Sequence, residues 1–175
     1  RMSQPANVLA LSRALAYDVR PIADADRGYA LDTWCESYKR SPDCAGMNWR
    51  MLKRHVKPEL DAVLARQDTR ILSAYRDDDR MLGWIAYSKL WGVPALHWVH
   101  TRFSVEKGGE ELRRRGIMSA LLEAAALGDH WFYTFKGPAR EFGNDKRTSD
   151  EKLVEILRRR GVWATFNPYR EWSKP

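Results

Sequence analysis

Hydrophobic positions along the chain change their spacing several times, and each change marks the passage from one helix or strand to the next. Apolar residues recur every three or four positions where a helix is expected, and they alternate or run together where a strand is expected. The pattern predicts strands over 17–22, 70–76, 81–89, 95–105, 130–136 and 162–166. It predicts helices over about 8–15, 24–38, 49–66, 113–127 and 150–160.

The order of these elements predicts a mixed, mostly antiparallel sheet with helices on its faces. The strands at 70–76 and 81–89 are joined by an acidic turn at 77–79 and form a hairpin. The later strands alternate with helices, which favours parallel crossovers. We therefore expect an α/β (α+β) fold of one domain over 1–175, with a core at about 17–166 and a sheet of about six to seven strands.

Local signals predict where several helices begin and end. Asp24 or Asp26 is suited to cap the helix that follows, because a carboxylate at this position accepts free backbone N–H groups. Pro58 is expected to break or kink the next helix. The run Arg158 to Arg160, with Gly161 just beyond it, is ordinary chemistry for the end of a helix.

Composition describes a folded protein with an excess of positive charge. Hydrophobic residues make up 44% of the 175 residues, and no apolar run approaches the roughly 18 residues of a membrane span. The net charge is +7. Residues 1–87 carry 14 basic and 12 acidic side chains, whereas 88–175 carry 16 and 11, so most of the excess lies in the C-terminal half. Such a charge suits an anionic small ligand or a nucleic acid.

Cysteines, histidines and the N-terminal residues bear on metals and on the compartment. Cys35 and Cys44 are nine residues apart, a spacing that matches no zinc or redox motif. The histidines include no pair that shares a helix face with an acid. The chain does not open with a signal-peptide pattern. We expect a reduced, cytoplasmic protein with neither a metal site nor a membrane partner.

An arginine cluster stands where one of the predicted helices begins. Arg113 to Gly116 precedes Ile117, Ala120 and Leu121, which recur at helical spacing. Cations near a helix N-terminus oppose the macrodipole by about 0.3–1 kcal/mol each at an exposed site, so their presence there points to an anion. Free backbone N–H groups and arginines together make a phosphate site. A solvated basic turn is the alternative interpretation.

Together with the order of the elements, this cluster resembles the GNAT superfamily of acyl-CoA-dependent N-acyltransferases. In that family the fourth strand leads into a helix through Gln/Arg-x-x-Gly-x-Gly/Ala, and residues 113–118, Arg-Arg-Arg-Gly-Ile-Met, match the Arg and the first Gly. Arg20-Pro21-Ile22 looks like the family's first strand, and Arg159-Arg160-Gly161-Val162 looks like the end of its last helix. The resemblance in element order covers most of 17–166.

The resemblance implies that acetyl-CoA is the cosubstrate, and it implies where acetyl-CoA binds. In the family the fourth and fifth strands splay apart, and the pantetheine arm lies in the gap as an added strand would. The pyrophosphate rests on the N–H groups that open the next helix. The residues that would bind acetyl-CoA here are Val105, Arg113, Arg114, Arg115, Gly116, Ile117, Met118 and Ser119.

Two positions depart from the family's pattern. Met118 stands where the family has Gly or Ala, and its side chain either points into the core or comes close to the ligand. Leu157 stands four residues before the glycine of the last helix, where the family often has a tyrosine that protonates the leaving thiolate.

The resemblance places the acid–base chemistry on or near the fourth and fifth strands. Acyl transfer needs a group that removes a proton from the amine and donors that stabilise the oxyanion. His100 and Glu106 are candidate bases, acting directly or through water, and Tyr133 is the candidate acid. The alternatives are a hydrogen-bonded strand histidine, a solvated turn carboxylate and a packed aromatic ring.

Three aromatic residues flank the loop that covers the acceptor in the family. Trp34, Tyr38 and Trp49 are therefore candidates for the acceptor pocket. Core packing is the alternative, because most aromatic side chains are buried.

Two functions remain. The first is an N-acetyltransferase acting on a primary amine of a protein lysine, a protein N-terminus or a small molecule. The second is a catalytically inactive GNAT-like module that binds a protein or nucleic acid, which the basic C-terminal half and Leu157 favour. The charge clusters do not interleave with aromatic residues and no helix-turn-helix pattern occurs, which argues against nucleic acid. Family members are often dimers, so a homodimer stays open.

Overall fold

The strands follow one another across a single sheet. The computed structural model describes residues 16–40, 44, 46–90, 92–102, 116–134 and 149–166. Within these residues the sheet has six strands in the order β1-β2-β3-β4-β5-β6. They are β1 (Tyr17–Pro21), β2 (Arg70–Arg76), β3 (Met81–Leu90), β4 (Val93–Thr101), β5 (His130–Tyr133) and β6 (Trp163–Phe166). The predicted strands are confirmed, with shifted ends.

The sheet is antiparallel on one side and parallel on the other. Each of β1 to β4 pairs antiparallel with the next. β4 pairs parallel with β5, and β5 pairs parallel with β6. This confirms the predicted mixed, mostly antiparallel sheet, because hairpins join the early strands and helical crossovers join the later ones.

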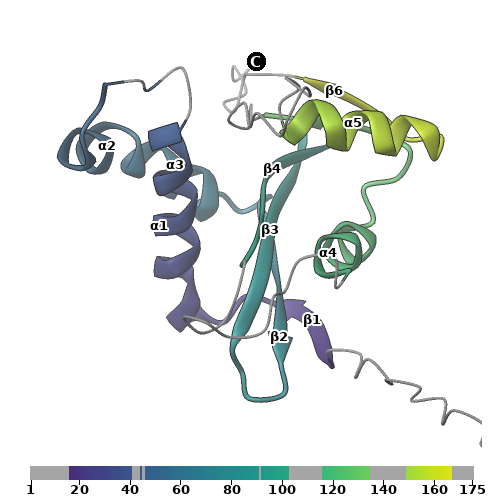
Figure 1. Cartoon of the computed structure of the whole chain (residues 1–175), viewed down its shortest axis with the longest axis horizontal. Helices are drawn as coiled ribbons and strands as arrows, with labels where there is room; N and C mark the ends of the chain where they lie inside the picture. The colour runs from purple at the N-terminus through teal and green to yellow at the C-terminus, as the bar shows by residue number, and fades with distance from the viewer. Residues whose placement is uncertain are drawn as a thin grey trace, which may run out of the picture.

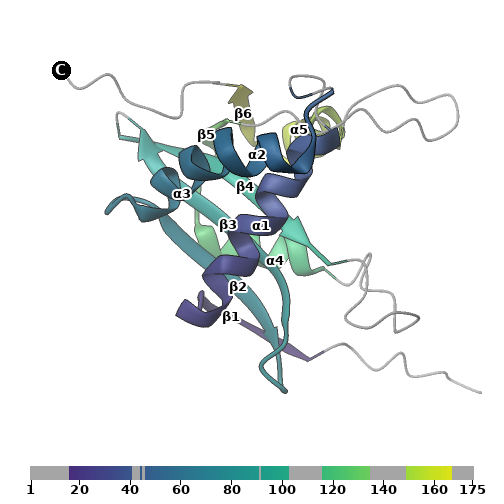
Figure 2. The same ribbon diagram turned by 90° about the vertical axis from the view of Figure 1, so that its left-hand side faces the viewer.

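Helices cover both faces of the sheet. They are α1 (Arg27–Ser37), α2 (Trp49–His55), α3 (Lys57–Ala65), α4 (Ile117–Ala125) and α5 (Ser149–Arg159), with 3₁₀ turns η1 (Asp24–Asp26) and η2 (Tyr38–Arg40). Figure 1 shows α1, α2 and α3 on one side of the strands and α4 on the other, and Figure 2 looks onto the side that α1 and α2 cover. No helix in the described ranges is long and apolar enough to cross a membrane.

Two hydrophobic clusters fill the two interfaces between sheet and helices. The first includes Trp34, Leu60 and Trp84 beneath α1–α3. The second includes Ile85 and Leu121, and joins the sheet to α4 and α5. Each fully buried side chain of this size contributes about 1.5–3 kcal/mol relative to exposure.

The predicted break in the helix over 49–66 lies at Val56, which ends α2 and precedes α3. Pro58 stands in the first turn of α3, where its missing N–H leaves no helical bond unmade. The side chain of Asn48 caps α2 by accepting the Met51 N–H at 3.0 Å. The prediction of a break near Pro58 is confirmed.

The end of α5 also agrees with its prediction. Gly161 has φ +79°. Its N–H donates to the Arg158 carbonyl at 3.0 Å, and the Val162 N–H donates to the Leu157 carbonyl at 3.0 Å. These two bonds form a Schellman ending, which requires a left-handed residue at the position of Gly161.

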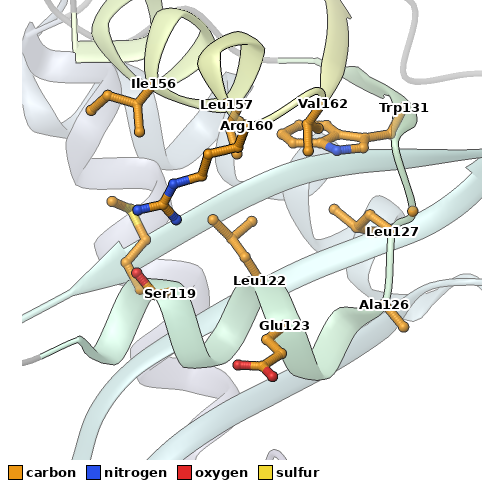
Figure 3. Close-up of a pocket in the computed structure, with 12 residues that line it drawn as sticks. Ser119, Leu122, Glu123, Ala126, Leu127, Trp131, Ile156, Leu157, Arg160 and Val162 are labelled. Carbon is orange, nitrogen blue, oxygen red and sulfur yellow. The ribbon is translucent and has the colours of Figure 1, made fainter.

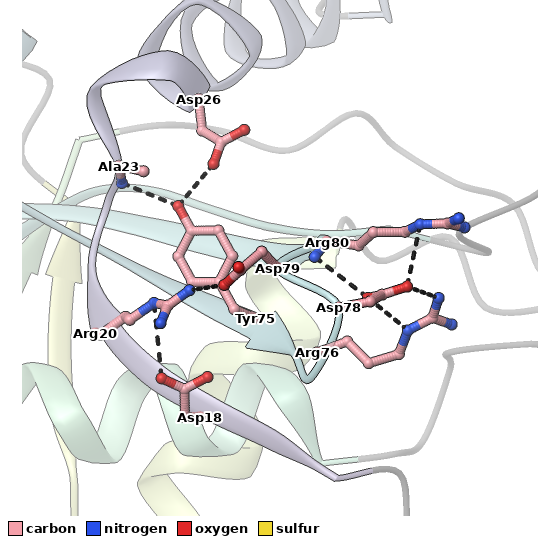
Figure 4. Close-up of polar contacts among 9 residues, drawn as sticks. All are labelled: Asp18, Arg20, Ala23, Asp26, Tyr75, Arg76, Asp78, Asp79 and Arg80. Atoms are coloured by element: carbon pink, nitrogen blue, oxygen red, sulfur yellow. Dashed lines mark hydrogen bonds and ion pairs between the residues drawn. The ribbon is translucent and has the colours of Figure 1, made fainter.

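The predicted capping hydrogen bond at the start of α1 is wrong. Asp26 occupies the cap position, but its side chain makes no capping bond within the described residues. Its carboxylate instead accepts from the Tyr75 hydroxyl at 2.9 Å, and that hydroxyl accepts the Ala23 N–H at 3.0 Å (Figure 4). The Arg20 guanidinium lies 4.5 Å from the centre of the same ring. The Asp26 carboxylate thus bonds to Tyr75 of β2 instead of capping its own helix, and this bond ties the start of α1 to the sheet.

Candidate functional site

The strands β4 and β5 separate after a short paired stretch. Their parallel pairing ends at Leu96 and Tyr133, and the Thr134 N–H donates to the Leu96 carbonyl at 3.0 Å. Beyond this point β4 continues to Thr101 with β3 on one side, and no described strand pairs with it on the β5 side. Among the described residues, the edge of 97–101 that faces away from β3 has no partner strand, and we call this edge the opening.

A β-bulge lies on β4 where the opening begins. Trp98 pairs with Ala86 of β3, and Leu96 pairs with the next residue, Tyr87, so His97 is an extra residue without a partner in the register. A bulge bends its strand and redirects the neighbouring backbone groups. The bend in β4 thus coincides with the point where β4 parts from β5.

The extra residue is held by two hydroxyl groups. His97 is 0% exposed, its Nε2 hydrogen-bonds with Ser88 Oγ at 2.8 Å, and its Nδ1 hydrogen-bonds with Thr134 Oγ1 at 3.2 Å. Burial lowers the pKa of His97 to about 4, so the ring is neutral at physiological pH. Sequence reasoning missed this residue, because neither the bulge nor its hydroxyl partners are visible in local periodicity.

His100, a predicted base, lies on β4 beside the opening. It pairs with Trp84 in register, and its ring meets Tyr29 of α1 edge-on, with centroids 6.5 Å apart. The guanidinium of Arg102 lies 4.2 Å from the centre of the same tyrosine ring. Burial, and secondarily the charge of Arg102, lower the pKa of His100 to about 4. Glu106, the other predicted base, lies outside the described residues.

Tyr133, the predicted acid, faces the other helical layer. It is half-buried and packs against the cluster that contains Leu96 and Leu121, whereas His100 lies on the α1 side of the sheet. The structure therefore places the predicted base and the predicted acid on opposite faces. Leu157, at the position of the family's tyrosine, is 9% exposed and belongs to the same cluster as Tyr133.

The N-terminus of α4 begins at a left-handed glycine. Gly116 precedes it with φ +79°, and no side-chain hydrogen bond caps the helix within the described residues. The first helical bond runs from the Ala120 N–H to the Gly116 carbonyl at 2.9 Å. The N–H groups of Ile117, Met118 and Ser119 come before that bond, so they are the donors that an anion would use.

Ile117 fastens this end of α4 to the sheet. Ile117 as a whole is 2% exposed, so its side chain is not available to a ligand. It lies over Gly83 of β3, where an added Cβ would come within 3.2 Å of Ile117 Cγ2 and 2.6 Å of the His100 carbonyl oxygen. The other predicted cofactor residues lie outside the described part of the chain: Val105, Arg113, Arg114 and Arg115.

A pocket of about 590 Å³ lies between α4 and α5. Met118 and Ser119 contribute from α4, Ile156 contributes from α5, and Trp131 of β5 also lines it. Met118 is 39% exposed and Ile156 is 49% exposed. Met118 therefore does not point into the core, and its closeness to the ligand stays a prediction.

Arg160 reaches into this pocket from the end of α5. Figure 3 shows its side chain crossing above α4 toward Ser119. The sequence interpretation treated the run Arg158 to Arg160 only as helix-ending cations. The residue stands four positions after Ile156, and this helical spacing, which puts both on one face, is the signal that could have identified it.

One of the three predicted acceptor residues is a core residue. Trp34 is 0% exposed, since it stacks on Trp98 at 6.3 Å and meets Trp84 edge-on at 6.1 Å between centroids. This corrects its expected place in the acceptor pocket, because a side chain without exposed surface cannot contact an acceptor. Trp34 instead packs against Trp98 of β4.

The other two aromatic residues remain accessible. Tyr38 and Trp49 are half-buried at the edge of the first cluster. The ammonium groups of Lys39 and Lys53 lie 4.7 and 5.1 Å from the centre of the Trp49 ring. Their role in binding an acceptor stays a prediction. Among the described residues, no group of His, Cys, Asp and Glu side chains is arranged to hold a metal.

Comparison with known proteins finds similarity in structure and none in sequence. No protein-family model matches the chain, and no curated protein matches it. A candidate acetyl transferase from Pyrococcus furiosus superposes with a TM-score of 0.50 at 14% identity, covering 91% of this chain and 86% of that chain. At this identity the likeness is one of fold.

Two further structures are similar at lower scores. An aminoglycoside 6′-N-acetyltransferase from Acinetobacter baumannii has a TM-score of 0.47 at 14% identity, with 81% of this chain and 89% of that chain covered. The PaiA N-acetyltransferase from Thermoplasma acidophilum, in complex with coenzyme A, has a TM-score of 0.43 at 17% identity, with 63% and 69% covered.

Proposed function

We propose that this chain, which has the fold of the GNAT N-acyltransferases, transfers an acetyl group from acetyl-CoA to a primary amine. One observation carries the proposal. The N-terminus of α4, which has no side-chain cap among the described residues, contributes Met118 and Ser119 to a pocket of about 590 Å³, and α4 connects β4 to β5, whose pairing ends at Leu96 and Tyr133. Backbone donors, a pocket and a strand edge that no described strand occupies are what a long phosphorylated thioester needs.

The cofactor side of the proposed site combines donors, charge and apolar surface. The N–H groups at the start of α4 would receive the pyrophosphate. Arg160, and Arg114 and Arg115 ahead of the helix, would add positive charge for the phosphates. Met118 and Ile156 offer apolar surface to the less polar parts of the cosubstrate.

The chemistry of transfer would take place at the opening. The amine nitrogen attacks the thioester carbonyl carbon, the C–S bond breaks, and coenzyme A leaves as a thiolate that takes up a proton. His100 is neutral at physiological pH and is the candidate that would accept the amine's proton, directly or through water; its pKa of about 4 makes it a weak base for this step. Glu106 is the second candidate base. Tyr133 is the candidate acid, since Leu157 carries no proton donor. Because Tyr133 and His100 lie on opposite faces of the sheet, Tyr133 would have to reach the sulfur across the opening. The N–H groups of β4 that face the opening would stabilise the oxyanion.

Ser119 allows a sharp test by calorimetric titration with acetyl-CoA. It is exposed in the first turn of α4 and lines the pocket. Ser119→Asp places a negative charge there, which favours the helix by about 0.3–1 kcal/mol but repels phosphate. Ser119→Asn has nearly the same shape without the charge. We expect binding by the wild type, at least a roughly tenfold loss for Ser119→Asp, and a change of less than about threefold for Ser119→Asn.

Other outcomes would contradict the proposal. If the folded wild type does not bind acetyl-CoA, acetyl transfer is excluded, and the inactive module that binds a protein or nucleic acid becomes the better explanation. If both variants bind as the wild type does, the phosphates do not rest at α4. The acceptor would then be sought by assaying the binding-competent protein against lysine peptides, N-terminal peptides and small amines.

A further inference from the structure

We propose that His97 is a positioning residue that sets where β4 and β5 separate. It ties the bulged part of β4 to β3 on one side and to the end of β5 on the other. The inference rests on the proposed function in one respect, because the opening beyond His97 is where acetyl-CoA would lie. The part that concerns the strands themselves stands on the geometry alone.

The register places His97 at the vertex of the opening. The last pair between the two parallel strands involves Leu96, and His97 is the next residue along β4. The bulge against β3 consists of this same residue, since Trp98 and Leu96 pair with consecutive residues of β3. The end of the parallel pairing and the bend in β4 therefore fall at one position, and the side chain at that position decides how both are held.

The contacts of His97 reach both neighbouring strands. Ser88 belongs to β3, and Thr134 directly follows β5. The three side chains are buried, with exposures of 2% for Ser88, 0% for His97 and 3% for Thr134. Both ring nitrogens are thus engaged, at 2.8 and 3.2 Å. Since water does not reach them, losing either partner leaves a buried polar atom unsatisfied, a larger penalty than losing an exposed bond.

The two hydrogen bonds of the His97 ring, which we call the Ser88 arm and the Thr134 arm, have different consequences. The bond to Ser88 joins strands that are already paired over eight residue pairs, so it adds little to the geometry of β3 and β4. The bond to Thr134 joins strands that share two residue pairs and the hydrogen bond from the Thr134 N–H to Leu96. Only the Thr134 arm spans the point of separation, so it is the one that controls the opening.

Amide side chains can separate the two arms. An asparagine places its amide near the position of Nδ1, and a glutamine places its amide near that of Nε2. His97→Asn therefore keeps a partner for Thr134, whereas His97→Gln keeps a partner for Ser88. Thr134→Val removes one hydroxyl with little change in shape, and Ser88→Ala removes the other.

The experiment measures acetyl-CoA affinity by calorimetry and melting temperature for these four variants. We expect Thr134→Val and His97→Gln to weaken binding about tenfold. We expect the acetyl-CoA affinity of His97→Asn and Ser88→Ala to stay within about threefold of the wild type. Their melting temperatures should fall by about as much as those of Thr134→Val and His97→Gln. Leu60→Ala, a buried change on α3, is a control for general destabilisation, and it should lower the melting temperature without weakening binding. Equal weakening in all the variants, or wild-type binding by Thr134→Val, would overturn the proposal.

Hydrogen exchange tests the strands without any ligand. If His97 holds the separation, the amide of Thr134, which bonds to Leu96, should exchange faster in Thr134→Val and His97→Gln than in His97→Asn. Unchanged exchange of this amide in Thr134→Val would refute the positioning role even if acetyl-CoA binds. If the amide exchanges faster in Thr134→Val and His97→Gln as expected, but the wild type does not bind acetyl-CoA, the positioning role stands and the proposed function is excluded.

Discussion

At the scale of single residues, the backbone of Gly116 sets the entry to α4. Its φ of +79° lies in the left-handed region, where a side chain costs about 1–2 kcal/mol. Gly116→Ala should therefore destabilise the protein by about 1 kcal/mol and turn the first N–H groups of α4. We expect acetyl-CoA affinity, measured by calorimetry, to fall about tenfold or more.

Gly92 provides the matched control for that change. It has φ +81°, and nothing lies within 4 Å of a Cβ added to it. Gly92→Ala should cost similar stability, measured by urea unfolding, and leave acetyl-CoA affinity unchanged. If the two alanine variants weaken binding alike, the backbone of Gly116 has no particular role in the site.

At the scale of elements, the approach of α4 to the sheet depends on Gly83. A Cβ there would lie 2.6 Å from the His100 carbonyl oxygen and 3.2 Å from Ile117 Cγ2. Gly83→Ala should force β4 and α4 outward and cost about 1–3 kcal/mol of the free energy of unfolding. Because α4 carries the proposed phosphate donors, we expect weaker acetyl-CoA binding as well.

The control for Gly83→Ala is a glycine whose replacement by alanine should raise stability instead of lowering it. Gly28 lies within α1, and an added Cβ meets nothing within 4 Å. Gly28→Ala should stabilise the protein by up to about 1 kcal/mol through helix propensity. Chemical denaturation of both variants decides the matter. A Gly83→Ala protein as stable as the wild type would mean that α4 adjusts freely, and the close packing would not position the site.

At the scale of the whole molecule, the buried His97 and the half-buried His100 make stability depend on pH. His97 and His100 each have a folded pKa of about 4, below the ordinary 6.5. Between these values the unfolded chain binds protons that the folded chain does not, so stability is complete above about pH 6.5 and is lost toward pH 4. From pH 7 to pH 5 we expect the free energy of unfolding to fall by on the order of 3 kcal/mol.

Urea unfolding at the two pH values measures this loss. Arginine and histidine partners hold the pKa values of Asp68, Asp78 and Asp129 below their usual range, so these three carboxylates stay ionised over this window. A variant with glutamine at both histidine positions should lose most of the dependence. Equal stability of the wild type at pH 7 and pH 5 would show that the two rings are not held neutral by burial.

The sequence by itself determined the elements and the local rules that end them. The strands and helices follow from the spacing of apolar residues, the break in front of α3 follows from Pro58, and the ending of α5 follows from Gly161. Each depends on interactions within a few residues along the chain, which is why periodicity and turn chemistry were sufficient to predict them. The element order and the arginine–glycine motif also led to the right fold.

Tertiary structure alone decided which side chains share a site. In the folded structure the Asp26 carboxylate bonds to Tyr75 instead of capping a helix, Trp34 is buried, and Met118 lines the pocket. It also placed His97 between hydroxyls that lie 9 and 37 positions away in the chain. These outcomes depend on competition between contacts from separate elements, and no local pattern records which contact wins, because burial and unsatisfied hydrogen bonds are properties of the assembled fold.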